Sequence, residues 1–425
     1  MAYSQKYSKD PYIKKIFVWA YIFKIGAGIA FALIYNFYYN WGGDTFYYYL
    51  NSCRLGDVLF SNPKAYFMMF FDMVDKTNVS ELPQTIEYFP YFRDPPVYAV
   101  HRFLSPFSVI GLKNYYLMNI CLNVFLYILN WKFFIFLNKL FPEKTKLIAI
   151  SVLFIPSVGF WGSGLLKDPF TLSFTFIFII YFYRIFFEKR IKIKNILFLI
   201  IASYVIIKLK PYILYSALVS CFVWLAFSYL YKIKNQFIRV FVFPFVITIM
   251  AFVGIYVLSN VGSIVGGAYE DVDSMLAKAA STQYDLKQDY YHGSTFDIGN
   301  LEPTVESAVS IAPKAIIAGL YRPFIWEARS VVMLLSGLEN LVLLVLTFYV
   351  ILKGGIRFFF KQLFSSPFLI FCLLFSIIMA LGIGLSTSNF GALVRFKIPM
   401  LPFFAMLWLF ILDNYNTRKK LKNLV

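Results

Sequence analysis

The length, composition and charge of the chain exclude an ordinary soluble domain. Of its 425 residues, 60% are hydrophobic and only 15% are charged, whereas soluble domains carry about 25% charged residues. The net charge of +18 does not indicate a nucleic-acid partner, because the basic residues are spread between apolar runs and form no continuous stripe. The composition predicts an all-α polytopic membrane protein, with residues 1–425 forming a single transmembrane domain.

Apolar runs long enough to cross a bilayer as helices recur along the chain. We expect about ten spans, at 16–38, 115–137, 147–164, 169–187, 195–209, 211–230, 237–258, 331–352, 366–385 and 398–412. The first run follows a basic start without a small-residue cleavage site, which predicts a retained helix. Pro211 and the adjacent lysines divide 195–230 into a hairpin of two short spans.

The distribution of Lys and Arg predicts the orientation of these spans. With both termini in the cytoplasm, the cytoplasmic segments, including "EKRIKIKN" and "TRKKLKN", carry nearly all of the excess positive charge, as the positive-inside rule requires. Two long segments then lie outside: a first loop, 39–114, with a helix lying at the membrane interface over 97–110, and a second loop, 259–330. Membrane lipids are the expected surroundings of all these charges.

Cations recur at four junctions on the predicted outer side. They are Lys167 beside Asp168 in "FWGSGLLKDPF", Lys208 and Lys210 at the hairpin, Arg322 in "YRPFIWEAR", and Arg395 and Lys397 in "NFGALVRFKIP". Cations that converge at one depth suit a phosphate or pyrophosphate group held near the lipid headgroups. Each has a simpler interpretation: a lysine can extend toward lipid headgroups, and Asp168 can cap the following helix.

A carboxylate is the second requirement of such a site. Asp44, in "WGGDTFYYY", lies just after the first span and could accept a proton from an attacking hydroxyl; alternatively, it caps a helix that begins at Thr45. Asp94 is a weaker candidate, for which a turn before two prolines and pairing to Arg93 is the favoured interpretation. Further candidates for contacts with a sugar or acceptor are Tyr48, Trp161, Trp326 and Glu327.

Several common catalytic motifs are missing from the sequence. There is no GxxxxGK[ST], HExxH or GxSxG pattern, and the chain has only two histidines. The four cysteines lie far apart, so neither a disulfide framework nor a CxxC metal site is expected.

Three motifs resemble a known class of enzymes. "GGDTFYYY" after the first helix resembles the GT-C superfamily of membrane glycosyltransferases, and "FIPSVGFWGSGLLKDPF" resembles the PSxxFWxSGxxKD stretch of bacterial membrane proteins described as hypothetical or as glycosyltransferases. "NFGALVRFKIPMLPF" is similar to the R-x-R/K-x-P stretch of these enzymes and of exopolysaccharide and O-antigen polymerases. The resemblance implies a GT-C-like fold in the bacterial cytoplasmic membrane, with an active site facing the periplasm or exterior.

The resemblance also implies an activity and roles for residues. A sugar would move from a polyprenyl-phosphate-linked donor to a glycan, lipid or protein acceptor, with Asp44 as the base. The lipid phosphate would bind the basic residues of the four junctions, with Asp168 beside them. Many members have Asp-Asp or Asp-Glu where this chain has Asp44 followed by Thr45. This departure weakens a metal-assisted mechanism, so no metal ligand is assigned, and Mg²⁺ or Mn²⁺ is left open as a cofactor.

Two other functions remain open at this point. A polysaccharide polymerase would depend on outer arginines more than on a carboxylate base. A transporter or a scaffold subunit of an envelope complex would need ionisable groups at mid-membrane, and Glu339 is the residue that could supply one. The enzyme hypothesis requires Asp44 and the cations to gather in one place.

Overall fold

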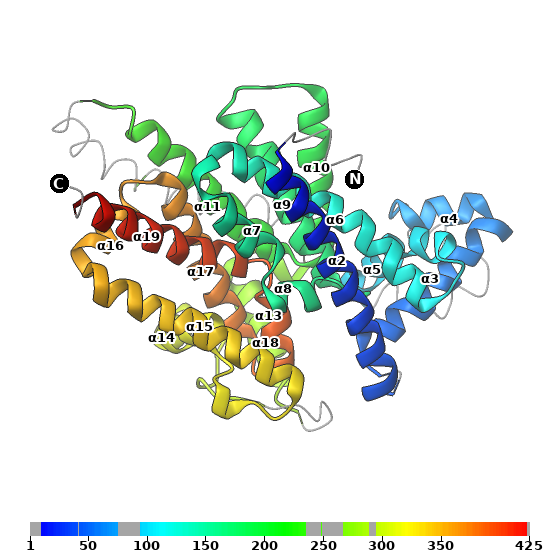
Figure 1. The fold of residues 1–425 in the computed structure, drawn as a ribbon. Coiled ribbons are helices and arrows are strands. Elements are labelled where there is room, and N and C mark those ends of the chain that lie inside the picture. Colours follow the sequence, from blue (N-terminus) through cyan, green and yellow to red (C-terminus); the bar gives the residue numbers. More distant parts are fainter. Residues whose placement is uncertain are drawn as a thin grey trace.

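The structure is a computed structural model that describes residues 10–40, 42–74, 94–234, 248, 267–288 and 295–422. Within these ranges it is all-helical and contains no strand, only an isolated bridge between Thr295 and Asn389. The elements in chain order (Figure 1) are α2 (Pro11–Leu33), π-helix η1 (Ile34–Tyr38), α3 (Asp44–Ser61), α4 (Pro63–Phe70), α5 (Pro95–Ile110), α6 (Tyr115–Leu140), η4 (Pro142–Lys144), α7 (Thr145–Leu153), α8 (Pro156–Trp161), α9 (Lys167–Phe186), α10 (Ile193–Leu209), α11 (Pro211–Leu230), η5 (Gly267–Tyr269), α13 (Val272–Asp285), α14 (Val305–Tyr321), η7 (Ile325–Glu327), α15 (Val331–Gly354), α16 (Ile356–Leu363), α17 (Pro367–Ser386), α18 (Phe390–Phe396) and α19 (Leu401–Lys422). The predicted all-α class is confirmed.

Six of the described helices are long and apolar enough to cross a bilayer, which identifies a membrane protein. They are α2 with η1, α6, α9, α11, α15 and α17, and a seventh span results if α18 and α19, which meet at a bend of 67°, count as one. The described residues therefore hold fewer spans than the ten expected. The predicted span 237–258 lies outside the described residues apart from residue 248, and α10 has only 17 residues.

The expected single span at 147–164 is wrong. α7 ends at Leu153 and α8 begins at Pro156, with Ile155 in an extended conformation between them (φ −67°, ψ 123°). A proline restricts the residue before it to extended conformations and lacks an N–H for the helix ladder, so the helix stops here. The predicted break at Pro211 is confirmed, because α10 and α11 meet at the extended residue Lys210 (φ −153°, ψ 80°), directly before Pro211. Of the two helices, α11 is among the candidate spans and α10 is not.

The first long loop is more deeply packed than expected. α5 confirms the helix predicted over 97–110, whereas its place at the membrane interface stays a prediction. It packs between α3, α6 and α10, and His101 and Arg102 are buried. Arg102 has a polar partner there, since its Nη1 lies 3.2 Å from Asp72 Oδ1. Residues 75–93 of this loop, and 259–266 and 289–294 of the second, lie outside the described residues.

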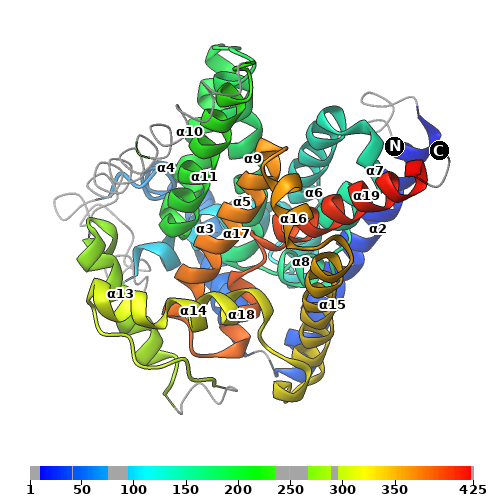
Figure 2. The same cartoon turned by 90° about the vertical axis from the view of Figure 1, so that its left-hand side faces the viewer.

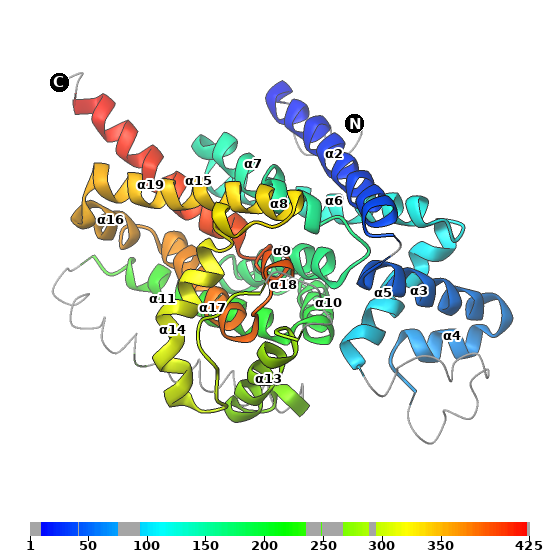
Figure 3. The same cartoon turned by 90° about the horizontal axis from the view of Figure 1, so that it is seen from below.

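The helices form three groups along the molecule. α3, α4 and α5 lie at one end and α14, α15 and α16 at the other, with α6 and α9 between them (Figures 1 and 3). Seen from the end that carries α14, α15 and α16, the helices α15 and α16 lie in front (Figure 2). α17 packs against α11, α14 and α19, and α6 packs against α2 and α9. The first turns of α3 and α9 are thereby brought to α18.

A buried polar clamp fixes the loop that precedes α9. The Ser163 carbonyl accepts hydrogen bonds from Asn119 Nδ2 (2.9 Å) and Asn123 Nδ2 (2.8 Å), both on α6, and the Gly162 carbonyl accepts one from Lys24 on α2. Buried carbonyls in a membrane need hydrogen-bond donors. These side chains supply the donors that the interrupted helix lacks. The clamp holds the backbone that leads into Lys167 and Asp168.

We expect Gly28→Ala to loosen this clamp. A Cβ at Gly28 would lie 2.5 Å from Asn123 Nδ2 and 2.7 Å from Asn119 Oδ1, so both amides would have to move. Losing a buried hydrogen bond costs about 1–3 kcal/mol, which should lower the thermal midpoint of the purified protein by several degrees. Gly26→Ala on the same helix is the matched control, because nothing lies within 4 Å of the added Cβ. Equal midpoints for the two variants would refute the clamp.

Candidate functional site

Asp44 is the first residue of α3 and does not cap it. The N-cap is Gly43, whose φ of +79° suits glycine and places Asp44 in the first turn. The carboxylate is instead an ion-pair partner: Arg395 Nη2 donates a hydrogen bond to Asp44 Oδ2 at 3.0 Å. The Asp44 side chain is 52% exposed. The capping interpretation is therefore wrong, and the carboxylate is open to an incoming molecule.

Asp168 occupies the opposite environment. The N-cap of α9 is Leu166, so Asp168 lies within the first turn and is not the cap. It is completely buried (0% exposed), and Lys210 Nζ donates a hydrogen bond to its Oδ1 at 2.5 Å. Burial lowers the pKa of Lys210 to about 8, opposed by the Asp168 carboxylate. A carboxylate buried this deeply requires such a partner, so Asp168 and Lys210 form a fixed pair.

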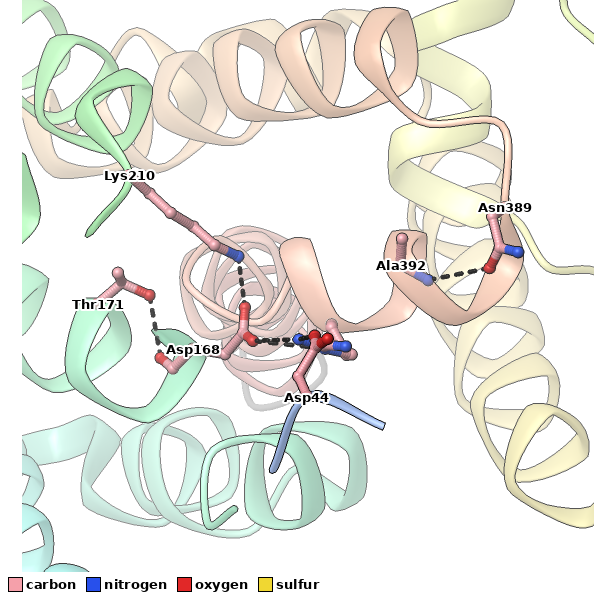
Figure 4. A network of polar contacts seen from close by, with 7 residues as sticks. Asp44, Asp168, Thr171, Lys210, Asn389 and Ala392 are labelled. Carbon is pink, nitrogen blue, oxygen red and sulfur yellow. Dashed lines mark hydrogen bonds and ion pairs between the residues drawn. The ribbon is translucent and has the colours of Figure 1, made fainter. Parts of the chain in front are cut away.

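Arg395 joins the two carboxylates. It lies in the last turn of α18, whose start is capped by Asn389 Oδ1 accepting from the N–H groups of Gly391 and Ala392. Its Nη2 and its buried Nε each lie 3.5 Å from Asp168 Oδ2, so the guanidinium also forms an ion pair with this carboxylate. Figure 4 shows Asp168 between Lys210 and Asp44, with side chains from four distant segments meeting.

The two residues after Arg395 contact different parts of the molecule. The Phe396 ring lies 3.9 Å below the Lys210 ammonium group, a cation–π contact. Lys397 is fully buried and donates to Asn340 Oδ1 at 2.6 Å and to the Arg322 carbonyl at 3.0 Å. Lys397 is therefore a structural anchor between α18 and α15, one turn away from the Asp44 site.

Lys167 is a cation without a partner. Among the residues that the structure describes, none forms a hydrogen bond or ion pair with its ammonium group, although the side chain is mostly covered. Its charge interacts with the carboxylates of Asp94, Asp44 and Asp168 through space. It also reaches His101: burial, reinforced by the positive charge of Lys167, lowers the pKa of His101 to about 3, so the imidazole is neutral at physiological pH.

The other predicted cations are already paired elsewhere. Lys208 Nζ lies 2.5 Å from Asp72 Oδ2, the carboxylate that also binds Arg102. Arg322 donates from Nε to Glu327 Oε1 at 3.0 Å, and its guanidinium lies 4.6 Å from the centre of the Phe296 ring. The structure thus brings Lys167, Lys210 and Arg395 to the two carboxylates Asp44 and Asp168, while Lys208 and Arg322 serve separate ion pairs.

The remaining candidates differ in exposure. Asp94 caps α5 by accepting from Val97 N at 3.1 Å, in line with its favoured interpretation, whereas its proposed partner Arg93 lies outside the described residues.

The aromatic candidates differ in whether a ligand could touch them. Tyr48 is buried against His101, and its pKa is raised first by burial and then by the charge of Asp44. Trp161 is buried against Phe31 and Phe160. Trp326 is 77% exposed and stacks on Phe324, so it alone of the two tryptophans is free to contact a ligand.

Three residues that take part in these contacts were missed from the sequence. Asn340, beside Glu339 in an apolar run, is a polar side chain in a membrane helix and could have been singled out for that reason. Asp72 and Phe396 carry no comparable signal. Glu339 accepts from Ser157 N at 2.8 Å and so ties α15 to α8.

The site does not fit a divalent cation. No group of three or more His, Cys, Asp or Glu side chains suited to a metal gathers in the described ranges. The space where Asp44 and Asp168 face each other is taken by the Arg395 guanidinium, with Lys210 behind it. A metal ion there would meet the positive charges of Arg395 and Lys210.

The fold and the site define a polytopic helical membrane protein with an ionic cluster where distant helices meet. Comparison with known proteins gave no match: no family model, no curated protein and no solved structure is similar enough to this chain to infer a relationship.

Proposed function

We propose that this protein is a membrane glycosyltransferase that moves a sugar from a polyprenyl-phosphate-linked donor to an acceptor on the extracytoplasmic face of the membrane. The observation that carries the proposal is that Arg395 joins a half-exposed carboxylate, Asp44, to the buried Asp168–Lys210 pair. The charge of Lys167, from the same turn as Asp168, acts on both carboxylates. An enzyme for such a donor needs apolar helices for the lipid tail, cations for the phosphate and a base for the acceptor.

The proposed reaction assigns a role to each group. Asp44 takes the proton of the acceptor hydroxyl, whose oxygen forms a new bond to the anomeric carbon of the sugar. The bond from that carbon to the phosphate oxygen breaks, and the electron pair leaves with the phosphate. Arg395 and Lys167 stabilise the negative charge that develops on the leaving group. Asp168 and Lys210 hold Arg395 in place and are positioning residues.

A polysaccharide polymerase is the second candidate, and one observation favours it. The centre of the site is an arginine, Arg395. A second arginine, Arg322, pairs with Glu327, and its guanidinium lies 5.5 Å from the centre of the Phe390 ring, on the helix that carries Arg395. Such an enzyme would rely on these arginines and tolerate loss of the Asp44 carboxylate.

The test is reconstitution of the full chain into liposomes with a radiolabelled polyprenyl-phosphate sugar and a set of glycan, lipid and protein acceptors. Transfer of label to an acceptor, with release of polyprenyl phosphate, is the expected result. Elongation of a lipid-linked glycan would favour the polymerase. Movement of a solute across the membrane without consumption of lipid-linked sugar would refute the enzyme hypothesis and favour a transporter.

A further inference from the structure

The two carboxylates that bind Arg395 differ sharply in their freedom to move. Asp168 is completely buried and is held by Lys210 at 2.5 Å. Asp44 is 52% exposed, lies in the first turn of α3 directly after Gly43, and makes its one described ion pair with Arg395. An exposed ion pair contributes little stability, so an anion that competes for Arg395 would displace Asp44 and leave Asp168 in place.

We propose that the donor phosphate takes the place of Asp44 on Arg395, so that the catalytic carboxylate is released only when the donor is bound. The inference rests on the proposed function for the role of Asp44, whereas the exchange itself concerns only an anion, a carboxylate and Arg395. In the absence of donor, Asp44 Oδ2 accepts the hydrogen bond from Arg395 Nη2. The oxygen that would take a proton is therefore engaged by the guanidinium until the donor arrives.

The ammonium group of Lys167 favours this exchange. The charges of Asp94, Asp44 and Asp168 act on it through space, but it has no hydrogen-bond or ion-pair partner in the described parts of the chain. A phosphate bound between Lys167 and Arg395 would neutralise the unpaired ammonium group. It would also accept from Arg395 Nη2, the donor that Asp44 gives up. Arg395 Nε stays with Asp168, whose Oδ2 lies 3.5 Å away.

The exchange predicts a binding order for the two substrates. The acceptor hydroxyl can be deprotonated only after the donor phosphate has freed Asp44, so the donor binds first.

The test measures binding of a phosphate probe to purified full-length protein. Dodecyl phosphate in maltoside micelles represents a lipid-borne phosphate, and inorganic phosphate represents the free ion. We expect Asp44→Asn to bind dodecyl phosphate up to about fivefold more tightly than the wild type, since it removes the competing carboxylate from an exposed ion pair. Arg395→Gln should bind it at least about tenfold more weakly.

Asp57→Asn is the matched control. Asp57 lies on the same helix, is 54% exposed and pairs with Lys113, so its replacement changes the net charge equally without touching Arg395. Unchanged affinity for Asp57→Asn together with tighter binding by Asp44→Asn supports the exchange. If the variants rank in the same order with inorganic phosphate but bind it only at far higher concentrations, the site takes a lipid-borne anion. Equal tightening by inorganic phosphate assigns it to a free anion and overturns the donor role.

The outcomes separate this inference from the proposed function. Unchanged or weaker binding by Asp44→Asn overturns the exchange even if sugar transfer is observed. Tighter binding by Asp44→Asn without sugar transfer by the wild type upholds the exchange and refutes the transferase.

Discussion

Asp44→Asn is expected to lower the rate of sugar transfer by about 10²–10⁴-fold, the range for loss of a general base. The amide keeps the size of the carboxylate and can still contact Arg395, but it cannot accept the acceptor's proton. The rate is measured with the reconstituted protein and a radiolabelled lipid-linked donor at saturating concentration. Donor binding should persist, because the cations are untouched.

Asp57→Asn again provides the control, since it removes an equally exposed carboxylate from the same helix. Its transfer rate should match that of the wild type. A rate for Asp44→Asn within tenfold of the wild type would exclude Asp44 as the base. It would favour the polymerase, whose activity would depend on arginines.

Arg395→Gln should have the second large effect, on both activity and folding. Arg395 is 18% exposed and is shared by Asp44 and Asp168, so its loss leaves the buried Asp168 with Lys210 alone. Removing one partner of a buried ion pair costs about 3–5 kcal/mol. We expect a lower thermal midpoint of the purified protein and no measurable transfer, because the leaving phosphate also loses its main cation.

Two variants distinguish the phosphate-binding role from a structural one. Arg395→Lys keeps a positive charge and should recover most of the thermal midpoint but little of the transfer rate, since an ammonium group cannot pair with two carboxylates as a guanidinium does. Lys208→Gln removes a cation that pairs with Asp72, away from Asp44, and its transfer rate should stay near that of the wild type. A strong loss of transfer in Lys208→Gln would show that the phosphate binds elsewhere.

The helices themselves were predictable because their signal is local. Apolar runs of sufficient length placed α2, α6, α9, α15 and α17 within a few residues of their observed bounds. Pro211 marked the turn between α10 and α11 for the same reason, since a proline ends a helix wherever the chain lies. The same rule applied to Pro156 would have revealed the break between α7 and α8, which the apolar run concealed.

The amino-acid sequence alone determined the membrane class, most helices and the set of charged residues, Asp44, Lys167, Asp168, Lys210 and Arg395 among them, since charge is costly in apolar segments and therefore conspicuous. Only the tertiary structure decided which charges meet. Lys208 and Lys210 are two residues apart, yet one binds Asp72 and the other Asp168. Arg395 and Lys397 diverge in the same way, because side chains two apart on a turning backbone point to different neighbours. The Asp44–Arg395 pair spans 351 residues, a separation over which no local pattern specifies a contact and only helix packing does.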